Sequence, residues 1–488
     1  MGEIARTLPK VNARNRAWRS VERAFLVILL AGLAVGCAKK GVGVGPQVAP
    51  GQPPPVPGAP VMGPQGQQFA VSDAPTGGPS AVERPKMNAA AAQAYAAGLS
   101  AFQAGDLAGA QLQFTSATQA DPRAFQAFYS LGTVRERLSN RAGAISAYRQ
   151  ALAIVRDYEP ALVGVALAQA QGGQEAEAEA FLQSARAQFP SSAAVLAALA
   201  EVKSILGDSG EAQKLAQEAL KKNPDYRPAM VTLARDHYRR RRLDLALYAL
   251  KGILDGYGDE NPARDKNNAV ARLLRGLIYK EQGQKAPAID EFRKALELRP
   301  DLVEARVQLA AYLLEAGNAV DALPLLEGAL RYDSNNVLAH LNLGDAYRLL
   351  GRPQDAKREL EWVAKKDPSL PQVHYNLGLL YLFSDNIPGV SAEQASDMAI
   401  DALQKFQQMR PRGGGGRADD TEELITRAKT KKALIEAQKA DAAAASAPEA
   451  APAAGAPAAP APAAGATPAP AAPAGAAAFP TAPEGAAK

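Results

Sequence analysis

Small residues recur through the middle of the chain every 34 residues, and bulky apolar residues stand beside them. The first row of small positions, with one longer step of 42, is Gly98, Gly132, Ala166, Ala200, Ala234, Gly276, Ala310, Gly344 and Gly378. A second row follows at Ala110, Ala144, Ala178, Ala212, Ala246, Ala288, Ala322, Ala356 and, after a longer step, Ala399. Small side chains let two helices approach closely, so the pattern predicts antiparallel helix pairs.

Turn residues separate the two helices of each predicted pair. A glycine ends the first helix in many units, at Gly105, Gly173, Gly207, Gly283, Gly317 and Gly351. Prolines close many units, at Pro122, Pro190, Pro224, Pro300, Pro368 and Pro411. One pair cannot bury its apolar face alone, so the pairs are expected to stack into a solenoid.

This spacing resembles the tetratricopeptide repeat, which has small residues at its eighth, twentieth and twenty-seventh positions and proline at its thirty-second. The resemblance implies an all-α fold, a right-handed superhelix of about nine units over residues 88–413, whose first helices line a concave groove. It also implies that positions 2, 5, 6, 9, 12 and 13 of each first helix face this groove.

These positions supply the candidate binding residues, which are Arg235, Tyr238, Arg239, Asn342, Asp345, Arg348, Tyr375 and Asn376. Arginine binds carboxylates or phosphates through paired N–H groups, and asparagine can donate to and accept from an extended backbone. Two plainer interpretations stay open. The run Arg239–Arg242 can be a solvated turn, and asparagine before Leu-Gly is common in this repeat.

The spacing breaks near residues 255–275. The fifth unit is eight residues longer than the 34-residue period, around the acidic segment Asp255–Asp265. In the sixth unit, Arg272 and Arg275 then stand at positions that are usually apolar. We therefore expect a polar seam here, which would divide the array into sub-domains of five and four units.

The N-terminus has the layout of an export signal. Six basic residues precede the uncharged stretch Ala24–Gly36, which is too short to span a bilayer as a helix. Leu33–Cys37 resembles a bacterial lipobox, which implies that residues 1–36 are a signal peptide and that Cys37 carries the lipid, with acyl chains such as palmitate. The alternative is an ordinary cysteine after an uncleaved anchor. Ala38 is not the aspartate that marks inner-membrane retention, which favours the outer membrane, facing the periplasm.

Low-complexity segments flank the repeats. Residues 37–87 are rich in proline and glycine and predict a disordered tether, and residues 447–488 predict a disordered Ala/Pro-rich tail. Between repeats and tail, residues 417–446 predict a capping helix, with Leu424, Ile425, Ala428, Leu434 and Ile435 near one face.

Composition argues against an enzyme. The chain of 488 residues has one cysteine and three histidines, and it contains no phosphate-binding loop, zinc motif or nucleophile elbow. His340 and His374 share a repeat position, but we interpret them as packing residues rather than metal ligands. The net charge of +5 is too small for its length to indicate nucleic acid binding, and we expect no cofactor and no small-molecule substrate.

Together these features predict a lipid-anchored periplasmic scaffold that binds segments of envelope proteins. The layout is similar to that of tetratricopeptide-repeat lipoproteins of myxobacterial gliding motility and of pilus assembly. This resemblance implies a role in a motility, type IV pilus or export complex. The alternative is an adaptor for enzymes of peptidoglycan or exopolysaccharide synthesis.

Overall fold

The fold is described from a computed structural model, which places residues 61–62, 68–69, 84–384, 386–409 and 420–446. The chain divides into two compact units, Met1–Ile435 and Glu436–Lys488. Cys37, most of the predicted tether and the predicted tail lie outside the described residues, so these predictions stay as they are.

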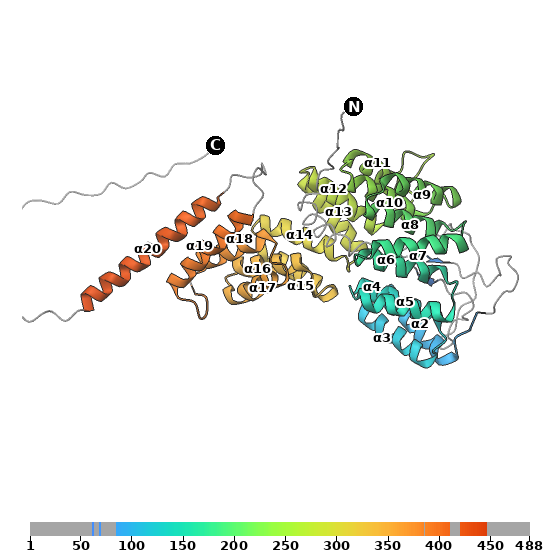
Figure 1. The fold of residues 1–488 in the computed structure, drawn as a ribbon, viewed down its shortest axis with the longest axis horizontal. Helices are drawn as coiled ribbons and strands as arrows, with labels where there is room; N and C mark the ends of the chain where they lie inside the picture. Colours follow the sequence, from blue (N-terminus) through green and yellow to red (C-terminus); the bar gives the residue numbers. More distant parts are fainter. Residues whose placement is uncertain (1–60, 63–67, 70–83, 385, 410–419, 447–488) are drawn as a thin grey trace, which may run out of the picture. The chain divides into compact units, whose positions relative to one another are not determined.

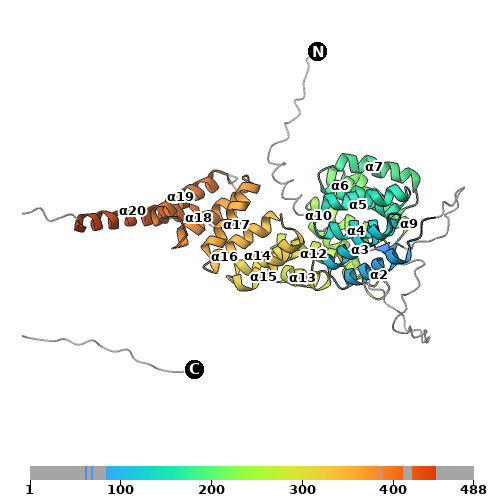
Figure 2. The ribbon, with the colours of Figure 1, turned by 90° about the horizontal axis from the view of Figure 1, so that it is seen from below.

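Helices make up nearly all of the described chain (Figure 1). The first helices of the nine units are α2 (Ala89–Gln103), α4 (Phe125–Arg137), α6 (Glu159–Gln171), α8 (Ala193–Leu206), α10 (Arg227–Arg239), α12 (Ala269–Glu281), α14 (Val303–Glu315), α16 (Val337–Leu349) and α18 (Pro371–Phe383). The second helices are α3 (Leu107–Ala120), α5 (Arg141–Ile154), α7 (Glu175–Gln188), α9 (Ser209–Lys222), α11 (Leu243–Leu254), α13 (Lys285–Leu298), α15 (Ala319–Tyr332), α17 (Pro353–Lys366) and α19 (Ala392–Met409). The predicted all-α solenoid is confirmed, and Figure 2 shows the helices from α12 to α20 following one another along the array.

The turn inside each pair follows from local chemistry. In the fourth unit, α8 ends at Gly207, whose φ of 93° places it in the left-handed region that glycine adopts without strain. The side chain of Asp208 then accepts a hydrogen bond from the Glu211 N–H and caps α9. Two units have other residues in this conformation, Ser139 (φ 55°) and Arg241 (φ 61°).

The small residues of the first row are required by the packing inside each pair. A Cβ at Gly98, Gly132 or Gly276 would lie 2.5–2.6 Å from ring atoms of Phe114, Tyr148 or Phe292, respectively, on the second helix. Such distances are shorter than van der Waals contact. The close approach of the two helices therefore depends on glycine at these positions.

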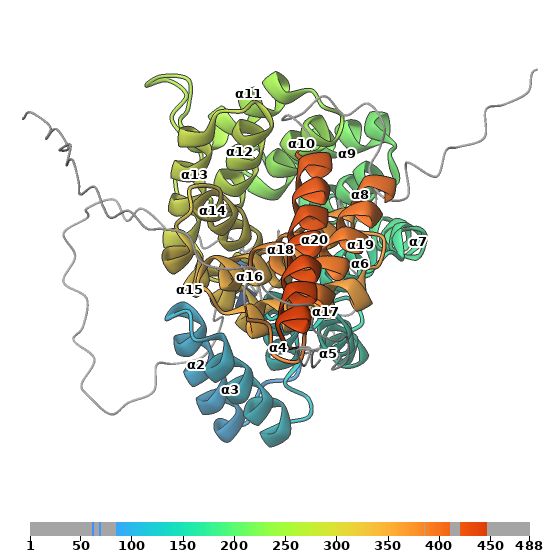
Figure 3. The ribbon, with the colours of Figure 1, turned by 90° about the vertical axis from the view of Figure 1, so that its left-hand side faces the viewer.

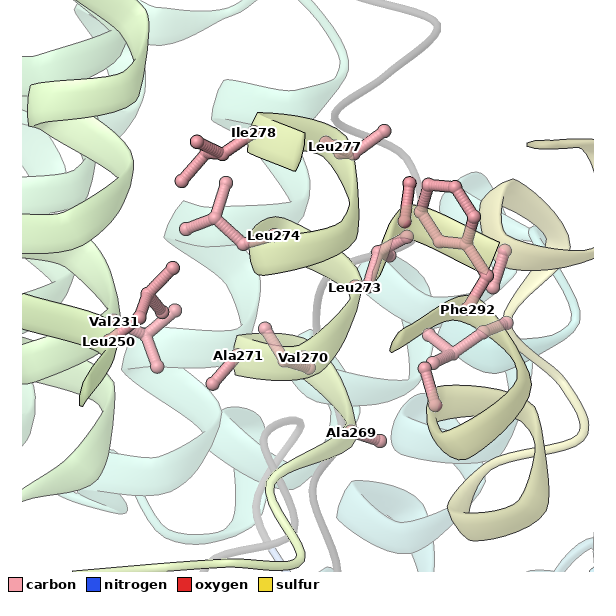
Figure 4. Close-up of a cluster of buried hydrophobic side chains, with 14 of the residues drawn as sticks. Val231, Leu250, Ala269, Val270, Ala271, Leu273, Leu274, Leu277, Ile278 and Phe292 are labelled. Carbon is pink, nitrogen blue, oxygen red and sulfur yellow. The ribbon is translucent and has the colours of Figure 1, made fainter. Parts of the chain in front are cut away.

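The hydrophobic core continues across the insertion. Val231 and Leu250 of the fifth unit lie in one cluster with Leu274 and Phe292 of the sixth unit (Figure 4). The polar contacts expected at this place are also present, because Arg275 pairs with Asp255 at 2.5 Å and with Glu291 at 2.7 Å. The structure therefore does not divide the array here; the polar contacts lie beside an uninterrupted apolar core.

Two short elements complete the description. Strands β1 (Val61–Met62) and β2 (Gln68–Phe69) pair antiparallel inside the predicted tether, and β1 contacts α4. Helix α20 (Thr421–Ser446) begins with Leu424, Ile425 and Ala428 buried against the last units.

The expected apolar face of α20 is shorter than the sequence suggested. Leu434, which the sequence places near the same face as Leu424, leaves 58% of its surface exposed, whereas the neighbouring Ile435 is half-buried. The first turns of α20 supply its buried apolar contacts, and further along Lys431 donates to the Leu382 carbonyl and Lys432 pairs with Asp397.

Candidate partner-binding surface

The predicted groove residues of the fifth unit bind their own chain in this structure. Arg235 leaves only 6% of its surface exposed and pairs with Glu201 of α8 at 2.6 Å. Arg239 pairs with the other carboxylate oxygen of Glu201 at 2.7 Å and donates to the Ser204 hydroxyl. Both arginines thus join neighbouring first helices, and Arg235 is not open to a partner.

Glu201 is the residue that makes this arrangement possible, and the sequence analysis missed it. Burial alone would raise the pKa of Glu201, but the charges and hydrogen bonds of Arg235 and Arg239 outweigh burial and lower it to about 2. A sequence signal existed, because Glu201 and Arg235 stand 34 residues apart at the same repeat position. Opposite charges in register on adjacent helices predict an ion pair.

The rest of the arginine run lies at the surface. Arg240, Arg241 and Arg242 are exposed. Arg241 pairs with Glu281 at the end of α12 at 2.5 Å, and the Tyr238 hydroxyl donates to the same carboxylate at 2.8 Å. Tyr238 and Arg241 therefore connect the fifth unit to the sixth, while Arg240 forms no ion pair among the residues described.

The candidate binding residues of the eighth and ninth units are partly exposed. Asp345 and Arg348 pair with each other on α16 at 2.7 Å. The Tyr375 hydroxyl donates to the Asp420 carboxylate, just before α20, at 3.0 Å. Asn342 and Asn376 are half-buried at the same repeat position of α16 and α18. This end of the array presents amides and one ion pair, which suits contact with an extended peptide.

The two histidines at the shared repeat position have different surroundings. His340 Nδ1 lies 2.6 Å from Glu359, and the His340 ring lies 3.8 Å, centroid to centroid, from that of Trp362. His374 is buried, and burial lowers its pKa. The described residues contain no group of three side chains that could hold a metal ion.

The insertion builds an exposed aromatic pair that sequence reasoning also missed. Tyr257 folds back onto α11, with its ring centroid 5.0 Å from that of Tyr248. Its hydroxyl donates to the backbone carbonyl of Tyr248, and Gly252 leaves room for the ring. Tyr248, on the second helix α11, and Tyr257, in the insertion, are both exposed, so this pair lies away from the first helices.

A second buried carboxyl gives the array a pH dependence. Burial raises the pKa of Glu304, at the start of α14, to about 7, although Gln308 donates to it. The pKa of Glu304 in the folded protein is raised above its ordinary value of 4.5. Glu304 therefore contributes fully to the stability of the fold below about pH 4.5, and this contribution is lost as the pH rises through 7.

We therefore expect Glu304→Gln to be more stable than the unchanged protein at pH 8, by about 2 kcal/mol, and nearly equal to it at pH 4. Urea unfolding followed by circular dichroism at both pH values measures this difference. Glu297→Gln, at an exposed position of α13, is the control and should change neither value. Equal stability of Glu304→Gln and the unchanged protein at pH 8 would contradict the prediction.

The described residues contain no helix long and apolar enough to cross a membrane.

Sequence profiles of the tetratricopeptide repeat match residues 95–159, 160–192, 198–262, 269–302 and 313–380, which together exceed half of the chain. The chain is a tetratricopeptide-repeat protein. Proteins of this family act as scaffolds that bind peptides or other proteins, and this coarser part of the predicted function is supported.

Several solved structures are similar to this chain at low identity. The Cut9–Hcn1 hetero-tetramer of the APC/C is 14% identical, over 74% of this chain and 79% of that chain, with a TM-score of 0.46. YrrB, a repeat protein with an unusual peptide-binding site, is 21% identical over 44% of this chain and 97% of its own, with a TM-score of 0.33. PilW, a type IV pilus biogenesis factor, is 20% identical over 46% and 99%, with a TM-score of 0.33.

Proposed function

We propose that this protein is a lipid-anchored periplasmic scaffold whose repeat array binds segments of other envelope proteins. The observation that supports binding is the array itself, in which nine successive first helices present the same repeat positions. Each first helix adds a few polar or charged side chains to a surface built on rigid packing. A surface of this kind fits an extended segment better than a small molecule.

The anchor and the location rest on the N-terminal sequence. Leu33–Cys37 follows an uncharged stretch and basic residues, as in a lipoprotein signal, and Ala38 favours the outer membrane. The machine we favour is a motility, type IV pilus or export complex, because the combination of lipobox, many repeats and Ala/Pro-rich ends is similar to the layout of such lipoproteins. An adaptor for peptidoglycan or exopolysaccharide synthesis enzymes is the second candidate.

Photo-crosslinking in cells tests the binding role. A photoreactive amino acid at Asn376, on the first helix of the ninth unit, should capture envelope proteins, and the same group at the exposed Leu112 on α3 serves as control. Motility, pilus or export subunits captured only from Asn376 would support the first candidate, and glycan synthases would support the second. Equal capture from both positions would contradict binding by the first helices.

Cys37→Ser tests the anchor in the same cells. Without the thiol no thioether to the lipid can form, so the variant should lose labelling by a palmitate analogue and move from the membrane fraction to the soluble fraction. Labelling that persists in Cys37→Ser would contradict lipidation at this residue.

A further inference from the structure

Distant parts of the array meet at the end of α4. Arg137 Nη1, in the last turn of this helix, lies 3.9 Å from Asp301 Oδ1, in the turn between α13 and α14. Tyr332, at the end of α15, packs against the apolar cluster formed by α2 to α5. Figures 1 and 3 show α15 next to these N-terminal helices. The second unit therefore contacts the sixth and seventh units.

This contact leaves several buried guanidinium nitrogens without a hydrogen-bond partner in the described part of the chain. The side chains of Arg137 and Asp301 are only 4% and 8% exposed, and Arg299 also pairs with Asp301, at 2.5 Å. One carboxylate thus serves two guanidinium groups. Arg137 Nε and Nη2 and Arg299 Nη1 are buried and have no hydrogen-bond partner among the described residues. A buried N–H group without a partner lowers the stability of the folded state, so these donors weaken the contact. The same donors could form hydrogen bonds with another acceptor.

Arg137 is held ready to bind an anion. Its guanidinium carbon lies 4.4 Å from the centroid of the Phe102 ring, which fixes the group by a cation–π contact. Burial lowers the pKa of Arg137 to about 10, so it is charged at neutral pH. The neighbouring Glu136 accepts a hydrogen bond from the Tyr148 hydroxyl at 2.8 Å and does not pair with Arg137.

We propose that Arg137 is a carboxylate-binding residue, that Asp301 of the same chain pairs with it in this structure, and that an acidic segment of a partner protein binds Arg137 by displacing Asp301. The proposal rests on the proposed scaffold function. A guanidinium group offers paired donors that match a carboxylate, and the unpartnered Nε and Nη2 of Arg137 are such a pair. Asp301 then acts as an internal competitor that keeps the second and sixth units together until the acidic segment arrives.

Binding of a fluorescent peptide of alternating Glu and Ala, measured by anisotropy at low ionic strength, tests this idea. Arg137→Met should weaken binding about tenfold or more, and Asp301→Asn should strengthen it by roughly three- to tenfold because the internal competitor is gone. Arg149→Met, at an exposed position of α5, is the matched control and should leave binding unchanged. A peptide of alternating Gln and Ala should not bind.

The opposite effects expected at Arg137 and Asp301 separate a binding role from a structural one. Unchanged binding in both variants, or weaker binding by Asp301→Asn, would overturn the proposal. Tyr332→Ala removes apolar packing between α15 and the N-terminal helices without changing a charge, so it too should strengthen peptide binding. Weaker binding by this variant would contradict the proposal. If the acidic peptide does not bind but crosslinking from Asn376 still captures envelope proteins, only the acidic-segment proposal fails and the scaffold function stands.

Discussion

Replacing Glu201 by alanine is expected to destabilise the array by about 3–5 kcal/mol. The carboxylate is buried between Arg235 and Arg239, and its removal leaves the guanidinium group of Arg235 charged, buried and without a counter-ion. The effect comes less from the lost attraction than from the desolvated charge that remains. Chemical unfolding in urea, followed by far-ultraviolet circular dichroism, measures the loss.

Two further variants show whether burial is the cause. Glu218→Ala breaks the partly exposed Arg186–Glu218 pair and should cost less than about 1 kcal/mol. The double variant Glu201→Ala, Arg235→Met removes the stranded charge and should recover part of the stability. If Glu201→Ala costs no more than Glu218→Ala, the pair with Arg235 is not the stabilising element that its geometry indicates.

Replacing Phe292 by alanine is expected to cost about 3–5 kcal/mol and to destabilise both sides of the insertion. The ring is fully buried, lies against Gly276, and belongs to the cluster that extends from α10 to α16 (Figure 4). The cavity would weaken the interface of α12 with its neighbours as well as the pair to which Phe292 belongs. Amide hydrogen exchange should therefore increase in α10 as well as in α14.

Leu245→Ala is the control for this experiment, because Leu245 lies on α11 with half of its surface exposed and should change stability by less than about 0.5 kcal/mol. Exchange that increases only after residue 268, with α10 unaffected by Phe292→Ala, would show that the insertion separates two folding units. The interrupted array expected from the sequence would then hold in solution in spite of the continuous core.

The 34-residue period of the sequence predicts most of the fold. Gly276 and Phe292 are sixteen positions apart, within one helix pair. The same spacing of a small and a bulky residue recurs in other units, so the sequence predicts their contact. The pair of Glu201 and Arg235 is also readable, because stacking brings the same repeat position of adjacent units together. Interactions within a unit or between neighbours are short-range in the sequence, and the 34-residue period encodes them.

The tertiary structure decided what the period does not encode. The contact of Arg137 with Asp301 depends on the rotation accumulated over several units, and small differences at each interface add up along the array. Whether Arg275 would break the core depended on the carboxylates around it, and Asp255 and Glu291 supply them. The sequence by itself determined the helix pairs, their small contact residues and their stacking order. Only the folded array decided which charged groups are buried together, because burial and pairing between distant units depend on where the whole chain runs in space.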